Sequence, residues 1–279
     1  MNDSEADANY MGEGHGANLA HRTDGAHAPD GGAGVYSSAG VGVDDRVIVA
    51  LDLPAGDARA LADTLRGRVR WLKVGMTLFD ESGPQIVDDL RERGFDVFVD
   101  LKLYDIPHQV AGAAGNVARL GAGMLTVHAS GGLAMMQAAV NAARRAAEEV
   151  GLPAPAVLAV TVLTSTDDAG LAEVGVGRPA REQVSLLAGL AKEAGVDGVV
   201  CSPREAAEMR GLLGDRALVV TPGVRPQWSE ANDQARVATP AEALSAGASH
   251  VVIGRPVVAA PVPAEALARV LGEIEGVGQ

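Results

Sequence analysis

Short apolar runs alternate with longer amphipathic stretches from about residue 46 to the end of the chain. Eight of these runs have the length and composition of buried strands. The predicted strands are 47–51, 71–75, 95–99, 124–127, 156–163, 198–201, 217–220 and 250–253. Stretches rich in Ala, Leu, Arg and Glu predict helices between most of them, for example at 57–66, 108–120, 132–150, 181–194 and 203–213. Several of these stretches end at a glycine (Gly94, Gly121, Gly195, Gly247), which is a typical helix C-terminal signal.

Eight strand-plus-helix units in about 230 residues predict an α/β fold of the (β/α)8 TIM-barrel type, built as a single domain. A doubly wound sheet also alternates strands and helices. That fold is disfavoured because its G-x-G-x-x-G phosphate fingerprint is absent after the first strand, where Leu51-Asp52-Leu53-Pro54 stands instead. We therefore predict a TIM barrel over residues 45–279.

Residues 1–44 have a different composition, rich in Gly, Ala, Asp and Ser. The segment contains seven acidic residues and one basic residue, Arg22, so it carries −6 of the net charge of −13. Such a segment buries too little apolar surface to offset its ordering entropy, and we predict a disordered acidic tail. His15, His21 and His27 recur every six residues, but nothing around them fixes the geometry of a metal site.

The overall composition restricts the class of protein. The chain has 279 residues, of which 47% are hydrophobic and only 3% aromatic, so a large core must be built from Val, Leu, Ile and Ala. The net charge argues against nucleic-acid and anionic-membrane partners. Cys201 is the single cysteine and is expected to be a small core residue, which suits a reducing compartment. The sequence shows neither a membrane-length apolar run nor a signal-peptide segment, so we expect a cytoplasmic protein.

The third predicted strand runs into a charged segment, Asp100-Leu101-Lys102-Leu103-Tyr104-Asp105. Side chains alternate along a strand, so Asp100 and Lys102 are expected on one face, about 6 to 7 Å apart. Asp105 falls beyond the strand, where the chain turns before Pro107. Two acids around a lysine at a buried strand end are costly unless they pair or take part in chemistry.

The carboxyl ends of the other strands supply further candidates, since the chemistry of a TIM barrel takes place at that end. Asp52 and Lys73 bring an acid and a base from the first two strands. Thr164 and Ser165 follow the fifth, and Pro222 and Arg225 follow the seventh. Gly254 and Arg255 stand after the eighth strand, at the predicted start of the last helix, where a close backbone N–H and a guanidinium suit phosphate. We therefore expect an elongated anionic ligand, with its phosphate at strands 7 and 8 and its reacting end at strands 1 to 3.

Simpler roles compete with each of these assignments. Asp52 alone could cap the following helix, and Lys73 alone could be a surface lysine with an extended side chain. Gly254-Arg255 could bind phosphate without further meaning. His128, at the end of the fourth strand, is expected to be a hydrogen-bonded structural histidine.

The stretch from Phe98 to Pro107, Phe-Val-Asp-Leu-Lys-Leu-Tyr-Asp-Ile-Pro, resembles the signature of the bacterial orotidine 5′-phosphate decarboxylase family. The resemblance extends over roughly residues 45–275 and includes further stretches in the family's order. These are Ala50-Leu51-Asp52, Leu72-Lys73-Val74-Gly75, Thr126-Val127-His128, Val160-Thr161-Val162-Leu163-Thr164-Ser165, Thr221-Pro222-Gly223-Val224-Arg225-Pro226 and Val252-Ile253-Gly254-Arg255-Pro256.

The resemblance implies decarboxylation of orotidine 5′-phosphate to uridine 5′-phosphate, the last step of pyrimidine nucleotide synthesis, without a metal or organic cofactor. It also implies a homodimer in which Asp105 and Ile106 reach into the partner's site. Lys102 would donate the proton to C6, and Asp100 would lie beside the leaving carboxylate. The other matched positions would bind substrate: Asp52 and Lys73 the ribose, Thr164 and Ser165 the pyrimidine, and Arg225, Gln234, Gly254 and Arg255 the phosphate side. Pro222 is also expected to contact the substrate.

Two adjacent positions depart from the family's pattern. After Ile106-Pro107 the family commonly has Asn-Thr, whereas this chain has His108-Gln109. The threonine is expected to contact the partner's substrate, so Gln109 must reach it with an amide or leave that bond to water.

Three functional interpretations stay open from the sequence. The leading one is the decarboxylase. The second is a related barrel that acts on a phosphorylated sugar acid or ketose, shares the Asp-x-Lys-x-x-Asp pattern and needs Mg²⁺. The third is a non-catalytic nucleotide-binding or scaffold protein that has kept the barrel, which is disfavoured because no catalytic position is missing.

Overall fold

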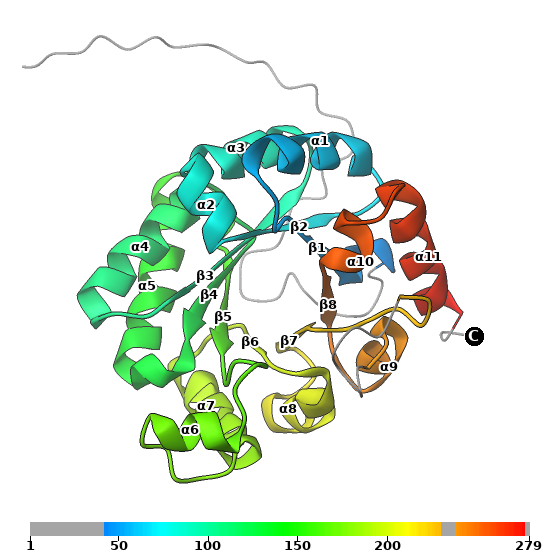
Figure 1. Cartoon of the computed structure of the whole chain (residues 1–279). Helices are drawn as coiled ribbons and strands as arrows, with labels where there is room; N and C mark the ends of the chain where they lie inside the picture. The colour runs from blue at the N-terminus through cyan, green and yellow to red at the C-terminus, as the bar shows by residue number, and fades with distance from the viewer. Residues whose placement is uncertain (1–41, 230–237, 277–279) are drawn as a thin grey trace, which may run out of the picture. The chain divides into compact units, whose positions relative to one another are not determined.

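The computed structural model describes residues 42–229 and 238–276, and within them eight parallel strands form a closed barrel in sequence order (Figure 1). The strands are β1 (Val47–Ala50), β2 (Trp71–Gly75), β3 (Asp96–Leu103), β4 (Met124–His128), β5 (Ala156–Val160), β6 (Gly198–Val200), β7 (Leu218–Pro222) and β8 (His250–Ile253). The predicted TIM barrel is confirmed. Residues 1–41 of the predicted tail lie outside the described residues, and the short 3-10 turn Asp44–Arg46 leads directly into β1.

Helices surround the barrel on its outer side (Figure 1). Five match the predicted stretches: α1 (Ala55–Leu65), α4 (Pro107–Arg119), α5 (Gly132–Glu149), α7 (Ala180–Ala194) and α8 (Ala206–Leu213). The others are α2 (Met76–Ser82), α3 (Gln85–Glu92), α6 (Asp168–Glu173), α9 (Pro240–Ser245), α10 (Arg255–Val258) and α11 (Pro263–Glu275). Arg255 therefore starts the short α10 and not the last helix, which corrects that part of the prediction.

Two strands, β3 and β5, end three or more residues away from the predicted position, and the other strands end within two residues of it. β3 continues beyond Val99 to Leu103 and so contains the charged segment, because Asp100 and Lys102 find partners that let them stay in the sheet. β5 ends at Val160, whereas the apolar run continues to Leu163. Leu163 is 41% exposed and belongs to the loop after the strand.

The apolar side chains form two layers, one on each face of the sheet. The inner cluster fills the barrel with residues such as Ile48, Trp71, Phe98 and Val220, and the outer cluster joins the opposite strand faces to the helices. Because side chains alternate along a strand, the inner face continues from Trp71 to Lys73, from Phe98 to Asp100 and from Ala50 to Asp52. The same alternation that packs the barrel therefore places the charged groups in the layer above its apolar filling.

His250 lies at the bottom of this filling, next to Trp71. The two rings meet edge to face with centroids 6.2 Å apart, and His250 Nδ1 lies 3.0 Å from Ser249 Oγ. Burial, together with the positive charges of Arg46 and Arg70, lowers the pKa of His250 from 6.5 to about 4. The histidine is therefore a neutral core residue at physiological pH.

This lowered pKa predicts acid sensitivity of the fold. Between pH 6.5 and 4 the unfolded chain takes up a proton at His250 and the folded chain does not. Above pH 6.5 His250 therefore does not lower the free energy of unfolding. As the pH drops from 6.5 to 4, proton uptake by the unfolded chain lowers that free energy by about 3 kcal/mol. Urea unfolding of the wild type and of His250→Gln across this range measures the contribution. The variant should lose stability less steeply with acid, and equal slopes for the two proteins would contradict the assignment.

Cys201 is buried, as predicted for a core residue, and burial raises the pKa of its thiol. No helix within the described ranges is long and apolar enough to cross a membrane.

Candidate active site

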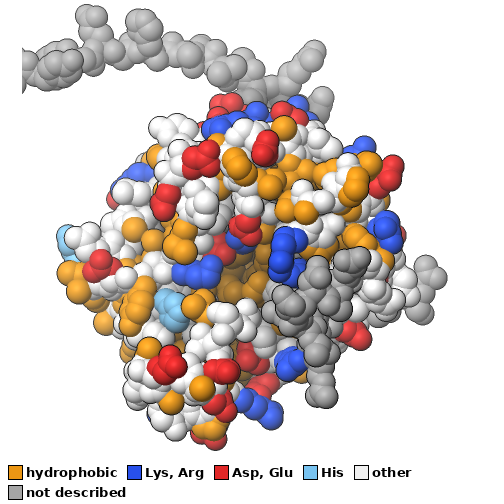
Figure 2. Space-filling model, in the orientation of Figure 1, with side chains coloured by type: hydrophobic (Ala, Val, Ile, Leu, Met, Phe, Trp, Pro, Cys, Tyr) orange, Lys and Arg blue, Asp and Glu red, His pale blue; other side chains and the backbone are white. Residues whose placement is uncertain are grey.

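A cavity of about 340 Å³ opens at the carboxyl ends of the strands. Its floor is apolar, made by side chains of the inner layer such as Ala50, Phe98 and Val252. Its wall carries Asp52, Lys73, Asp100, Lys102, Thr164, Pro222, Arg225, Gly254 and Arg255. Figure 2 shows a hollow near the middle of the face seen in Figure 1, bordered by apolar side chains and by charges of both signs. The cavity thus brings together nine of the predicted site residues.

Four of these residues form a continuous charge network. Lys73 Nζ lies 3.2 Å from Asp52 Oδ1 and 3.5 Å from Asp100 Oδ2. Lys102 Nζ lies 2.9 Å from Asp100 Oδ1. Asp100 therefore bridges the two lysines, and each charge in the network has a partner of opposite sign.

The four side chains of the network differ in their exposure to solvent. The side chains of Lys73 and Asp100 are only 10% and 12% exposed, whereas that of Asp52 is 64% exposed and that of Lys102 is 30% exposed. Burial alone would raise the pKa of Asp100, but Lys73 and Lys102, with hydrogen bonds from Lys102 and Thr126, bring it below its ordinary value. Asp100 is therefore a fixed negative charge that holds both ammonium groups, and Lys102 is the accessible one.

The backbone around Lys102 departs from a regular strand. Among the described residues other than glycine, Lys102 alone has a positive φ, of 52°. The pairing of β3 with β4 passes from Val99 opposite Leu125 to Leu103 opposite Val127. The side chains of Asp100 and Lys102 do meet, as predicted, but across this irregularity and not through simple alternation.

The opposite side of the cavity is basic. Arg225 follows β7, and Gly254 and Arg255 follow β8, where a Cβ on Gly254 would lie 3.7 Å from the Ala50 Cβ. Burial and the positive charge of Arg255 lower the pKa of Arg225. Two guanidinium groups that face one cavity and repel each other suit a doubly charged anion such as a phosphate monoester.

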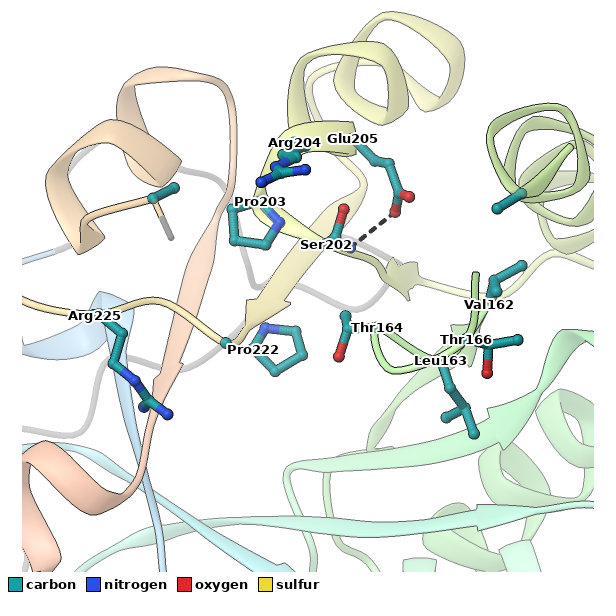
Figure 3. Close-up of a pocket in the computed structure, with 13 residues that line it drawn as sticks. Val162, Leu163, Thr164, Thr166, Ser202, Pro203, Arg204, Glu205, Pro222 and Arg225 are labelled. Atoms are coloured by element: carbon teal, nitrogen blue, oxygen red, sulfur yellow. Dashed lines mark hydrogen bonds between the residues drawn. The ribbon is translucent and has the colours of Figure 1, made fainter. Parts of the chain in front are cut away.

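A neighbouring cavity of about 590 Å³ lies under the loops that follow β5, β6 and β7 (Figure 3). Thr164 and Pro222 line both cavities, and in Figure 3 they lie between Arg225 and the group Val162, Leu163 and Thr166. Ser165 is exposed and does not line either cavity. Thr166, which is not among the predicted residues, lines the larger one. The Ser202 N–H, on the far wall, donates to Glu205 Oε2 at 2.9 Å, so Glu205 caps its own turn.

Three predicted residues lie away from the cavity of their own chain. Asp105, Ile106 and Gln109 are exposed on the segment that leads from β3 into α4. Asp105 Oδ1 accepts a hydrogen bond from the Ile106 N–H at 2.6 Å and pairs with no cation of the described chain. Gln234 falls outside the described residues.

Asp52 and Lys73 do not have the simpler structural roles that were considered for them. Asp52 does not cap α1, whose N-cap is Pro54 without a side-chain bond, and Lys73 is buried instead of lying on the surface. His128 Nδ1 accepts a hydrogen bond from the Ser130 N–H, and its ring stacks on Tyr104, so the structural role predicted for it is confirmed. Burial and the nearby Lys102 ammonium lower the pKa of His128.

The fold and the cavity define a (β/α)8-barrel protein whose cavity lies between a carboxylate–ammonium network and two arginines. The model of the orotidine 5′-phosphate decarboxylase / HUMPS family matches residues 45–270. The orotidine 5′-phosphate decarboxylase of Moorella thermoacetica is 52% identical over 235 residues, which are 83% of this chain and 92% of the relative. That of Alkalilimnicola ehrlichii is 54% identical over 230 residues, 82% of this chain and 96% of the relative.

A solved structure gives the same result. The crystal structure of orotidine 5′-phosphate decarboxylase from Lactobacillus acidophilus matches with a TM-score of 0.73 and 38% identity, over 82% of this chain and 99% of that one. The chain therefore belongs to the orotidine 5′-phosphate decarboxylase / HUMPS family.

Proposed function

We propose that this protein decarboxylates orotidine 5′-phosphate to uridine 5′-phosphate and CO2, the last step of uridine monophosphate synthesis, in the cytoplasm. The observation that carries the proposal is the Asp52–Lys73–Asp100–Lys102 network, which shares one cavity with Arg225 and Arg255. The names of relatives about 50% identical over most of the chain support the same reaction.

Lys102 supplies the chemistry that this reaction needs. When the C6–carboxylate bond breaks, its electron pair stays on C6, where no adjacent carbonyl delocalises it well. The Lys102 ammonium, held 2.9 Å from Asp100, stabilises that charge and then gives its proton to C6, after which solvent returns a proton to the amine. A preorganised donor of this kind contributes about 3 to 4 kcal/mol, by analogy with oxyanion-hole mutants.

The remaining residues of the cavity hold the substrate in the orientation that this chemistry requires. In this proposal Asp52 and Lys73 bind the ribose hydroxyls, and Thr164 and Pro222, which line the same cavity, border the pyrimidine. Arg225, Gly254 and Arg255 receive the phosphate. Binding energy from the distant phosphate contributes to orienting C6 against Lys102.

We further propose that the active enzyme is a homodimer in which Asp105, Ile106 and Gln109 complete the partner's site. Ile106 and Tyr104 are 62% and 63% exposed, and Met76, which follows β2 at the same end of the barrel, is 56% exposed. Large exposed apolar side chains on segments that follow β2 and β3 support an interface at this end of the barrel. The Tyr104–His128 stack, with ring centroids 5.6 Å apart, anchors the segment that carries Asp105.

The absorbance of orotidine 5′-phosphate provides the test of the reaction. Purified protein should convert the substrate to uridine 5′-phosphate at the same rate with and without EDTA. No turnover of orotidine 5′-phosphate, together with turnover of a phosphorylated sugar acid or ketose that EDTA abolishes and Mg²⁺ restores, would instead support the related metal-dependent reaction. Binding of uridine 5′-phosphate without any turnover would support the interpretation as a binding protein and contradict the proposed reaction.

A further inference from the structure

Thr126, in the middle of β4, lies beside the irregular part of β3. In the pairing of the two strands, three residues of β3 (Asp100, Leu101 and Lys102) stand opposite this single residue of β4. Extra residues in one strand form a bulge, and bulges next to active sites re-aim a side chain. Here the bulge contains both members of the Asp100–Lys102 pair.

The Thr126 hydroxyl forms a hydrogen bond with each of the two charged residues of the bulge. The Lys102 N–H donates to Thr126 Oγ1 at 2.8 Å, and the same hydroxyl donates to Asp100 Oδ1 at 3.0 Å. Lys102 Nζ donates to that carboxylate oxygen at 2.9 Å. One buried hydroxyl thus connects the backbone of the lysine to the carboxylate that holds its ammonium group.

The conformation of Lys102 explains why such a connection is needed. A residue with a long side chain at a φ of 52° lies in the left-handed region, which is unfavourable for residues other than glycine. Such a conformation persists only where its surroundings enforce it, and these outliers gather at functional sites. Without the hydroxyl, the Lys102 N–H would be left unpaired beside a fully buried side chain, and the conformation would lose its main support.

The geometry points to Thr126 as a positioning residue for the proposed decarboxylation: its hydroxyl holds Lys102 in the left-handed turn and Asp100 in register, so that the ammonium group faces the cavity. This inference rests on the proposed function. It concerns a residue that does not line the cavity and has no contact with the substrate in the proposal above.

Thr126→Val tests the inference, because valine keeps the shape of threonine and removes only the hydroxyl. We expect kcat to fall by about 10- to 100-fold, as for a lost buried bond to charged groups, while KM changes by less than about threefold. The Thr126 hydroxyl is also one of the groups that lower the pKa of Asp100, so the acidic limb of the kcat profile should move to higher pH in the variant. Thr126→Ser, which restores a hydroxyl, should recover most of kcat and the original limb.

Thr161→Val is the matched control. Thr161 is also fully buried, immediately follows a neighbouring strand, and donates its hydroxyl to the Val200 carbonyl at 3.2 Å, away from the charge network. This variant should lose stability but keep the wild-type kcat and pH profile.

Wild-type kcat and pH profile in Thr126→Val would overturn the inference, and so would equal losses of kcat in Thr126→Val and Thr161→Val. A wild-type protein that does not turn over orotidine 5′-phosphate would refute the proposed function instead, so the two failures are distinguishable.

Discussion

Lys102→Ala should lower kcat for orotidine 5′-phosphate by about 10⁴-fold or more, because one substitution removes both the general acid and the preorganised positive charge. The fold should remain, since Asp100 keeps Lys73 at 3.5 Å and the Lys102 side chain is already 30% exposed. Steady-state kinetics measure the loss of turnover. Circular dichroism and a urea midpoint on the same preparation show whether the fold and its stability are kept.

Lys192→Ala is the control for this prediction. Lys192 lies on α7 and donates to the Leu212 carbonyl at 2.8 Å, far in the sequence and fold from the charge network. Its replacement should leave kcat unchanged. Ordinary turnover by Lys102→Ala, or an equal loss in both variants, is incompatible with the role given to Lys102.

Mixing two inactive variants should restore activity if Asp105 acts in the partner's site. A dimer of one Asp105→Ala subunit and one Lys102→Ala subunit contains one site with both residues intact and one site with neither. Random exchange makes half of the dimers mixed, so the mixture should reach about a quarter of the wild-type rate. The readout is turnover after the subunits have been allowed to exchange.

The matched control replaces the Asp105→Ala subunit by the double variant Lys102→Ala/Asp105→Ala, with which no intact site can form. That mixture should stay inactive. Exchange itself is followed by mass labelling of one subunit. If labelled mixed dimers form and the first mixture is as inactive as its parents, Asp105 does not complete the site across an interface.

The barrel could be predicted from the sequence because its strands are buried on both faces and appear as apolar runs. The same signal failed at two strand ends. It stopped at Val99, since hydrophobicity cannot show that Asp100 and Lys102 stay in the sheet through their own bonds. It continued to Leu163, because an apolar loop after β5 is indistinguishable from the strand that precedes it.

The charged part of the site could also be predicted, because acids and lysines at the ends of buried strands are rare. The sequence contained one further signal. Only three of the 23 basic residues are lysines, and two of these three, Lys73 and Lys102, are in the network. Thr126 could not be found this way. Threonine is an ordinary strand residue, and its role depends on the register between β3 and β4, which the sequence does not display.

The position of bound uridine 5′-phosphate in a crystal structure of this protein tests the central claim most directly. The account predicts the phosphate at Arg225 and Arg255 and the Lys102 Nζ within about 3.5 Å of C6, the carbon that carried the departing carboxylate. A ring bound with another edge toward Lys102, or a Lys102 side chain turned to solvent and away from Asp100, would contradict it.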